Sequence, residues 1–255
     1  MPEQVFGSLT LMRLNEIATN ETYDFVNEHT WARGLRILEV GCGSGELAIR
    51  LQDDGHQVTA IDSAKDAVAI AKRAGADVRL ACWPDFTAEP FDLILFTRAL
   101  HHMQPLSPAV IRAKQLLKQS GLLLVEDFAF SDVHKEAAEW FYWLVLLLDA
   151  CGVLVLKEGA FGAKILKGRG AFELWQDHVH DINSADSVLR AISQEFEVLK
   201  TDSAPYFYRY LSEIVADNKQ GADVVSMALK MEKLAGLNNS AFFLGRRFVA
   251  RKLMK

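Results

Sequence analysis

Residues 37–45 read Ile-Leu-Glu-Val-Gly-Cys-Gly-Ser-Gly, an apolar strand that runs into glycine at every second position. Glycine tolerates positive φ and lets a backbone approach a ligand that a Cβ would exclude. A helix is predicted directly afterwards, over Gly45–Gln52, and the first N–H groups of a helix have no partners within it. A turn without a ligand does not require three such glycines, since each adds a cost in backbone entropy. The unit therefore predicts a nucleoside-binding site.

The glycine spacing separates two classes of nucleoside cofactor. A dinucleotide fingerprint reads G-x-G-x-x-G, whereas here the sixth position is Glu46 and the third glycine comes one residue early. This argues against a nicotinamide oxidoreductase. The run resembles the first motif of class I S-adenosylmethionine-dependent methyltransferases: aliphatic residues, an acid, an aliphatic residue and G-x-G-x-G. The resemblance implies that the loop passes beneath the methionine part of the cofactor, with these residues at the site: Glu39, Gly41, Cys42, Gly43 and Gly45.

Composition limits the remaining classes of fold and function. The chain has 255 residues, half of them hydrophobic, and a net charge of −5. Such a chain can form one large α/β domain, and its acidic balance argues against a general nucleic-acid surface. Its three cysteines are far apart and show no zinc-ligand spacing, which indicates a reducing compartment. With no secretory signal at Met1–Thr10, we predict a cytoplasmic protein.

Strand and helix patterns alternate along the chain, as expected for a mainly parallel sheet. The predicted strands are Arg36–Val40, Gln57–Ile61, Asp77–Ala81, Phe91–Phe96, Gly121–Asp127, Phe196–Thr201 and Phe242–Ala250. The predicted helices are Thr10–Thr30, Gly45–Gln52, Lys65–Ala74 and Pro108–Lys118. The last strand resembles the one that the methyltransferase family inserts antiparallel between strands five and six. The resemblance implies a Rossmann-like, doubly wound sheet of seven strands.

The predicted organisation is a single methyltransferase domain over residues 1–255. It begins with a helical segment over residues 1–34. Residues 129–192 exceed an ordinary connection and are rich in aromatic residues, which predicts a helical cap inserted between strands five and six. Within the cap, Trp140–Leu156 is almost wholly apolar. Because Asp149 would be costly in mid-bilayer, we expect a buried helix and no membrane span. The alternative is that residues 140–156 form the interface of a homodimer.

Asp62 ends the second predicted strand, about 20 residues beyond the first glycines. A carboxylate there can accept hydrogen bonds from both ribose hydroxyls, and the resemblance places the ribose acid at the same point. Asp62, followed by Ser63, can also cap the next helix. The family often has an adenine-binding acid where this chain has Cys82. Trp83 can stack on the base or belong to the core, and Arg98, after strand four, can bind the cofactor carboxylate.

Histidines supply the candidate catalytic groups, because an imidazole can act as a base near neutral pH. They are His101, His178 and His180, and we expect His101 to face the pocket while its neighbour His102 is structural. His178 and His180 either shape the acceptor pocket or belong to a turn. We predict no metal, since a third ligand at a characteristic spacing is missing.

Aromatic residues in and beyond the cap are the candidate acceptor contacts: Trp140, Trp143, Trp175, Tyr206 and Tyr208. An aromatic cap favours a small apolar or aromatic acceptor over a protein tail or nucleic acid. The sequence therefore predicts an S-adenosylmethionine-dependent methyltransferase that acts on an O or N atom of a small molecule. The alternative is a methyltransferase-like binding or regulatory protein without transfer activity.

Overall fold

The computed structural model describes residues 14–156, 164–166, 171–176 and 182–253. The described strands form one seven-stranded sheet: β1 (Arg36–Val40), β2 (Gln57–Asp62), β3 (Val78–Leu80), β4 (Phe91–Thr97), β5 (Leu117–Phe128), β6 (Phe196–Ala204) and β7 (Gly245–Lys252). Their order is β3-β2-β1-β4-β5-β7-β6. Strand β7 runs antiparallel to both of its neighbours, and the other pairs are parallel. The predicted fold class is confirmed.

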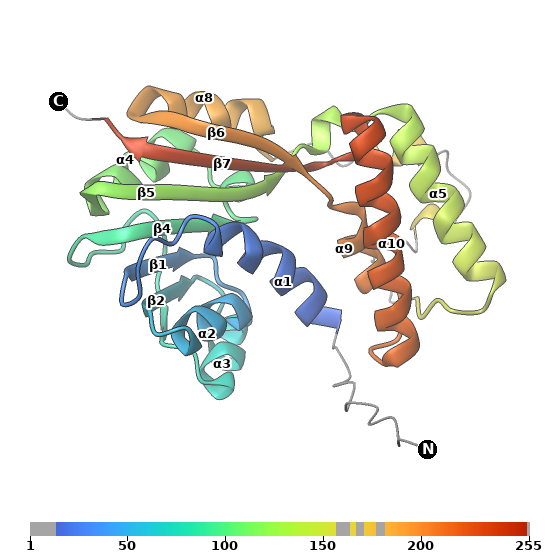
Figure 1. Ribbon diagram of the computed structural model, residues 1–255, viewed down its shortest axis with the longest axis horizontal. Helices are drawn as coiled ribbons and strands as arrows, with labels where there is room; N and C mark the ends of the chain where they lie inside the picture. The colour runs from blue at the N-terminus through green and yellow to red at the C-terminus, as the bar shows by residue number, and fades with distance from the viewer. Residues whose placement is uncertain (1–13, 157–163, 167–170, 177–181, 254–255) are drawn as a thin grey trace, which may run out of the picture.

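Helices cover both faces of this sheet and the edge at which the parallel strands end (Figure 1). The α-helices of the described residues are α1 (Leu14–Asn27), α2 (Glu46–Asp53), α3 (Lys65–Ala74), α4 (Leu106–Leu116), α5 (Lys135–Ala150), α7 (Ala171–Gln176), α8 (Ala185–Glu195), α9 (Phe207–Ser212) and α10 (Lys219–Asn238). Apolar residues of α1, α2 and α3 form a cluster with one face of the sheet. Helices α4 and α8 pack on the other face.

The central strands are apolar runs because they are buried on both faces. In β4, six of the seven residues are buried, from Phe91 to Thr97. The helices that flank them are amphipathic: α8 buries Val188 and Ile192 against the sheet. It begins at Ser184, whose side chain accepts a hydrogen bond from the Ser187 N–H. This N-cap satisfies one of the free donors of the first turn.

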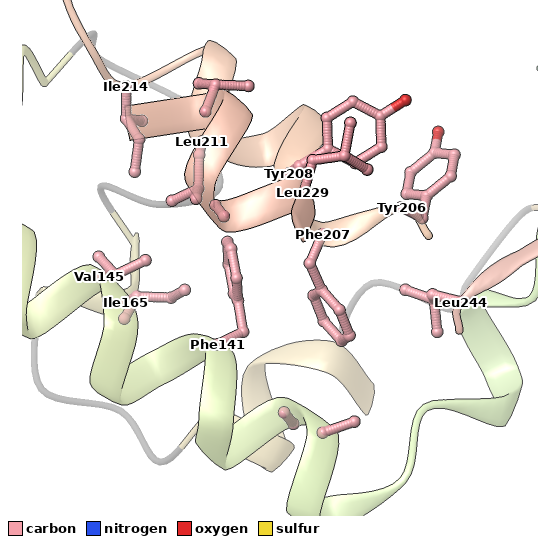
Figure 2. Packing of buried hydrophobic residues seen from close by; sticks show 14 of the residues in the cluster. Phe141, Val145, Ile165, Tyr206, Phe207, Tyr208, Leu211, Ile214, Leu229 and Leu244 are labelled. Carbon is pink, nitrogen blue, oxygen red and sulfur yellow. The ribbon is translucent and has the colours of Figure 1, made fainter. Parts of the chain in front are cut away.

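A third apolar cluster lies outside the sheet, where α5, α7, α9 and α10 pack together with the start of α1 (Figure 1). Figure 2 shows its centre, with Phe141 of α5 facing Phe207 of α9; the two rings stack at 5.1 Å between centroids. The cap thus has its own core. It combines the segment after β5 with a second segment, α9 and α10, that lies between β6 and β7.

The cap differs from the sequence expectation in its limits. Helix α8 begins within the predicted insertion 129–192 and ends beyond it, at Glu195, and it packs against α4 and the sheet as an ordinary connection to β6. Strand β7 begins at Gly245, whereas Phe242 ends a short 3-10 helix. There the Phe243 ring fills the space in which a Cβ of Gly236 in α10 would lie. Packing against α10 therefore delays the last strand.

The apolar stretch 140–156 forms most of α5 and the segment after it. Phe141 and Val145 are buried in the cap, while Trp143 and Leu147 are exposed. Among the described residues, none of the helices combines the length and the apolar character that a membrane crossing needs. The homodimer through this segment stays a prediction.

Candidate cofactor and acceptor site

The glycine loop is tied to the end of the neighbouring strand by backbone groups. Gly41, Gly43 and Gly45 all have positive φ, at 76°, 55° and 84°. The Gly41 N–H donates to the Ile61 carbonyl at 2.9 Å, and the Gly43 N–H donates to Oδ2 of Asp62 at 2.9 Å. Positive φ turns the chain sharply from β1 into α2, which only glycine does without strain.

The three glycines have different surroundings. A Cβ placed on Gly45 would come within 2.9 Å of Ala71 and 3.1 Å of Ala76, so this glycine lets α2 pack on α3. A Cβ on Gly41 would come within 2.9 Å of Ala99. A Cβ on Gly43 would meet no other residue within 4 Å. Gly43 therefore borders open space that a bound molecule can fill.

A cavity of about 550 Å³ opens at the carboxyl ends of β1, β2 and β4. Six of the predicted cofactor residues line it: Gly41, Asp62, Ser63, Cys82, Trp83 and Arg98. The other four, Glu39, Cys42, Gly43 and Gly45, are not among the lining residues. Open α/β sheets bind ligands at this edge, and the volume suits a nucleoside with a side chain.

Asp62 uses both carboxylate oxygens within the protein. Oδ2 accepts from Gly43, and Oδ1 accepts from the Ala64 N–H at 2.8 Å, at the start of α3. The carboxylate thus shapes the loop and the helix start, yet it still lines the cavity. Each oxygen can accept a further hydrogen bond, so a ribose contact and the capping contact are compatible.

Trp83 also has two roles. Its Nε1 donates to the Ala109 carbonyl at 3.1 Å, and its ring meets Phe96 edge-on at 5.5 Å. The indole is therefore fixed as part of the wall that it lines. The Cys82 thiol beside it is free.

Glu39 lies behind the loop and is 2% exposed. Burial raises the pKa of its carboxyl to about 7, against the opposing effects of Arg98 and the hydroxyl of Thr97. Oε1 accepts from that hydroxyl at 3.3 Å, whereas Oε2 is buried without a hydrogen-bond partner. A buried acceptor without a partner is costly, so Oε2 is suited to a donor from a ligand.

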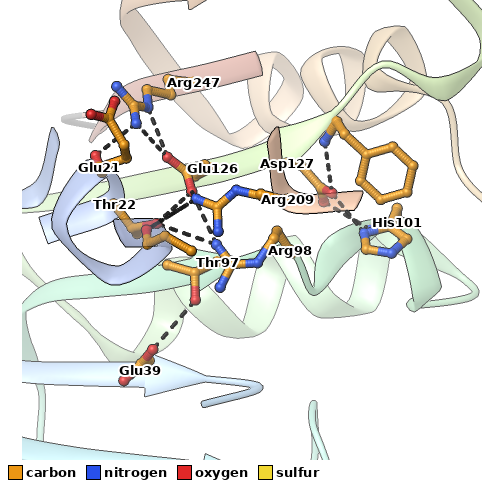
Figure 3. A network of polar contacts seen from close by, with 12 residues as sticks. Glu21, Thr22, Glu39, Thr97, Arg98, His101, Glu126, Asp127, Arg209 and Arg247 are labelled. Carbon is orange, nitrogen blue, oxygen red and sulfur yellow. Dashed lines mark hydrogen bonds and ion pairs between the residues drawn. The ribbon is translucent and has the colours of Figure 1, made fainter. Parts of the chain in front are cut away.

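Glu126 at the end of β5 gathers three guanidinium groups (Figure 3). Oε1 contacts Arg98 Nη1 at 3.0 Å and Arg209 Nη2 at 2.9 Å, and Oε2 contacts Arg247 Nη2 at 2.7 Å. Thr22 of α1 donates to Oε1 at 2.7 Å. Burial acts to raise the pKa of Glu126, but Arg209, Arg247 and Arg98 lower it to about 2. This cluster joins α1, the sheet and α9.

Arg98 is held by this cluster at one nitrogen. Its side chain is 34% exposed and lines the cavity. It has φ 61°, the one positive value among the described non-glycine residues, and its N–H donates to the Glu126 carbonyl. This strained backbone costs on the order of 1–3 kcal/mol and turns the side chain between Glu126 and the cavity.

His101 and His102 exchange the roles that we expected. His102 lines the cavity, and burial lowers the pKa of its imidazole. His101 is 4% exposed, and its Nδ1 lies 2.6 Å from Oδ1 of Asp127. Oδ2 of Asp127 accepts the His101 backbone N–H at 3.0 Å, so the carboxylate fixes both the ring and the turn. The two imidazoles lie 3.9 Å apart between centroids.

Two further residues complete the surroundings of His101. Phe128 meets the His101 ring edge-on at 4.5 Å and lies 4.9 Å from the Tyr206 ring. Asn183 holds the same turn, since its N–H donates to the His101 carbonyl at 2.8 Å. His101 thus lies between the cavity wall and the aromatic residues of the cap.

The predicted acceptor residues divide into three groups. Tyr206, Tyr208 and Trp175 are buried in the cap core, and Trp140 is partly buried there. Trp143 is 64% exposed, so the prediction that it contacts the acceptor does not fit the structure. It occupies the outer side of α5, where the helical period turns it away from Phe141 and Val145.

His178 and His180 lie outside the described residues. In the described ranges, no group of three or more His, Cys, Asp or Glu side chains is placed to hold a metal ion. Sequence reasoning did not assign Glu126, Asp127 and Arg209 to the site. The signal that could have found two of them is the pair of adjacent acids, Glu126 and Asp127, at the end of the predicted strand Gly121–Asp127.

A family model described as "Methyltransferase domain" matches residues 15–150, more than half of the chain. The chain belongs to the class I S-adenosylmethionine-dependent methyltransferases. Among curated relatives, it is 34% identical over 111 residues to a ubiquinone biosynthesis O-methyltransferase of Xylella fastidiosa, a match that covers 40% of this chain and 45% of the relative. The chain spans about half the length of the curated relatives it matches.

Solved structures share the fold at low identity. The methyltransferase superposes with a TM-score of 0.57 on a structure described as the 4+2 cyclase SpnF, at 20% identity and with 94% and 84% of the two chains covered. It superposes with a TM-score of 0.56 on coclaurine N-methyltransferase bound to N-methylheliamine and S-adenosylhomocysteine, at 16% identity and with 99% and 76% covered. These likenesses concern the fold alone.

Proposed function

We propose that this methyltransferase transfers a methyl group from S-adenosylmethionine to a hydroxyl oxygen of a small, apolar or aromatic molecule. The observation that carries the proposal is the Asp127–His101 pair at 2.6 Å, directly behind the wall of the sheet-edge cavity. The O-methyltransferase name of the Xylella fastidiosa relative agrees with this choice. The size of the cavity and the aromatic cap favour a small molecule.

The residues present fit the methyl donor. Asp62 can accept from the ribose hydroxyls, and Trp83 offers a fixed ring to the adenine. Glu39 Oε2 can accept from the donor's ammonium group, which would satisfy that buried oxygen. Arg98 has nitrogens left for the carboxylate. The bound donor supplies an electrophilic methyl group on a sulfonium.

The chain's own residues then handle the acceptor and its proton. The Asp127 carboxylate lies 2.6 Å from Nδ1 of His101, and in this proposal it favours a proton on that nitrogen, which leaves Nε2 as the basic nitrogen. Nε2 removes the proton of the acceptor hydroxyl, and Asp127 stabilises the imidazolium that results. Phe128 borders His101, Tyr206 packs on Phe128, and the two rings exclude water from that side. An amine acceptor would not require this base.

The test uses S-adenosylmethionine with a labelled methyl group and a panel of phenols, hydroxy acids and amines. We expect label in hydroxyl acceptors, and we expect His101→Gln and Asp127→Asn to lower kcat by about 10²–10⁴-fold. Affinity for S-adenosylhomocysteine should stay unchanged in both variants. The exposed His134 provides the control His134→Gln, with unchanged kcat. Transfer to amines alone, with full activity in His101→Gln, would contradict the proposal.

A methyltransferase-like protein without transfer activity is the second candidate. It is favoured by Cys82, which lines the cavity at the position of the usual adenine-binding acid. Donor binding without transfer to any acceptor of the panel would support this candidate.

A further inference from the structure

Two guanidinium groups of the Glu126 cluster use only part of their donors: Arg98, which lines the cavity, and Arg209, which contacts the same oxygen of Glu126. Every side-chain hydrogen bond that the structure shows for Arg209 starts from Nη2, toward Ala18, Thr22 and Glu126. Its Nε is buried and has no partner among the described residues. Arg98 likewise donates only from Nη1, to Thr22 and Glu126. Both arginines therefore retain free N–H groups after the cluster has formed.

Guanidinium groups outnumber the carboxylates that they contact directly in this cluster. Three arginines meet the single carboxylate of Glu126, and the neighbouring Asp127 contacts Nδ1 of His101. Glu21 pairs with Lys233 at 2.6 Å, and Glu232 accepts three backbone N–H groups at the start of α9. Among the described residues, Glu126 is therefore the one carboxylate in direct contact with the three arginines, and Arg209, whose side chain is 12% exposed, is the most buried of them.

Tyr206 adds a hydroxyl to this region. Burial raises the pKa of that hydroxyl, while Arg209 and Arg98 oppose the shift and Asp127 adds to it. The hydroxyl therefore lies within electrostatic reach of both the arginine cluster and the Asp127–His101 pair. It has no hydrogen-bond partner among the described residues. Figure 2 shows it pointing away from the apolar core of the cap.

We infer that the acceptor carries a carboxylate, held by the free nitrogens of Arg209 together with the Tyr206 hydroxyl. This inference rests on the proposed function. The Nε–H of a guanidinium can donate one charge-assisted hydrogen bond to a carboxylate, and a buried positive group is stable only when it is paired. Phe128 and Tyr206 then place the aromatic or apolar part of the acceptor beside His101.

The methyl donor also has a carboxylate, but that group does not balance the charge. It is accompanied by the donor's own ammonium group, so the amino-acid part is neutral, and the sulfonium adds a further positive charge. A carboxylate on the acceptor offsets the surplus and is attracted toward the sulfonium. We therefore assign Arg98 to the donor and Arg209 to the acceptor, an assignment that single substitutions can separate.

The test measures binding by calorimetry to the full chain saturated with S-adenosylhomocysteine. The probes are carboxylates and their neutral amides: 4-hydroxybenzoate and 4-hydroxybenzamide, 4-hydroxycinnamate and its amide, octanoate and octanamide. In at least one pair we expect the carboxylate to bind at least roughly tenfold more tightly than its amide, as one charge-assisted hydrogen bond implies. Arg209→Gln should bring that ratio to within about threefold, and Arg209→Lys should restore part of it.

Arg247→Gln is the matched control, because Arg247 also pairs with Glu126 but already uses Nε and Nη2 for Glu126 and the Glu21 carbonyl. It should lower the melting temperature as Arg209→Gln does and leave the probe ratio unchanged. Tyr206→Phe, which removes one donor and no recorded hydrogen bond, should reduce the ratio without loss of stability.

Three outcomes would overturn the inference: no pair with a preferred carboxylate, a preference that survives in Arg209→Gln, or equal loss of the preference in Arg247→Gln. If Arg209→Gln instead weakens S-adenosylhomocysteine itself, the arginine serves the donor and the inference is also wrong. Failure of the unsubstituted protein to bind S-adenosylhomocysteine would contradict the proposed function.

Discussion

The proposed donor side and the proposed acceptor side of this methyltransferase are built in different ways. The proposed donor side consists of the glycine loop and Asp62, which are joined by hydrogen bonds from backbone N–H groups. The proposed acceptor side depends on Glu126, whose partners come from α1, the residue after β4, α9 and β7. A local motif fixes the first, whereas side-chain charges from distant segments fix the second.

This difference implies that the two sides respond separately to substitution. A change in the loop should alter donor binding and leave the cap in place. A change in the Glu126 cluster should destabilise the joint between sheet, α1 and α9, because a buried arginine that loses its partner is costly. The predictions below test this separation, beginning with the largest effect.

Glu126→Gln should lower the free energy of unfolding by about 3–5 kcal/mol, since it removes the charge that three arginines share in a buried site. Urea unfolding near neutral pH measures the change. The control is Glu197→Gln, which breaks the exposed pair with Arg251 and should cost at most about 1 kcal/mol. A loss below that value for Glu126→Gln would mean that the cluster does not hold the two sides together.

Gly43→Val should weaken the binding of S-adenosylhomocysteine by at least about 100-fold, because the new side chain enters space that we assign to the donor. Its φ of 55° adds backbone strain of about 1–3 kcal/mol. Gly55→Val is the matched control: Gly55 also has positive φ and no atom within 4 Å of a built Cβ, but it lies in the turn before β2. Equal affinity in both variants would exclude the donor from the loop.

Glu39→Gln should stabilise the free protein at pH 8 by about 1–3 kcal/mol and weaken S-adenosylhomocysteine binding. The folded pKa near 7 lies above the unfolded value of 4.5, so the contribution of Glu39 is fully present below pH 4.5 and is lost as pH rises through 7. The difference between variant and unsubstituted protein should therefore shrink at pH 5. Urea unfolding from pH 5 to pH 8 measures it, with the exposed Glu89→Gln as control. A constant difference would contradict the raised pKa.

The same division separates the parts of the structure that the sequence predicted from the parts that it did not. The loop glycines and Asp62 are set by local backbone geometry, so their spacing was enough to place Gly41 and Asp62 at the cavity. The order of the sheet followed from the family resemblance. The part that failed depends on contacts between distant residues. Asp127 draws His101 behind the wall, and no local pattern announces that pairing.

The cap shows the same limit. Trp143 and Phe141 look alike in an apolar stretch, but the packing of α5 on α9 buries one and exposes the other. The contribution of α9 and α10 to the cap depends on Glu232, which accepts N–H groups from the start of α9, twenty-odd residues earlier in the chain. A buried acid in a helix gives no sign in the sequence of the partners it will meet.

The measurement that tests the separation most directly is calorimetry with S-adenosylhomocysteine on three proteins: the unsubstituted chain, Asp62→Ala and Arg209→Gln. We predict that Asp62→Ala weakens binding by about 1–3 kcal/mol, because two ribose hydroxyls lose an acceptor, while Arg209→Gln binds as the unsubstituted protein does. If Asp62→Ala only melts earlier and binds with full affinity, its carboxylate serves the loop and the start of α3 alone. That result, or equal losses in both variants, would contradict a donor site built independently of the acceptor side.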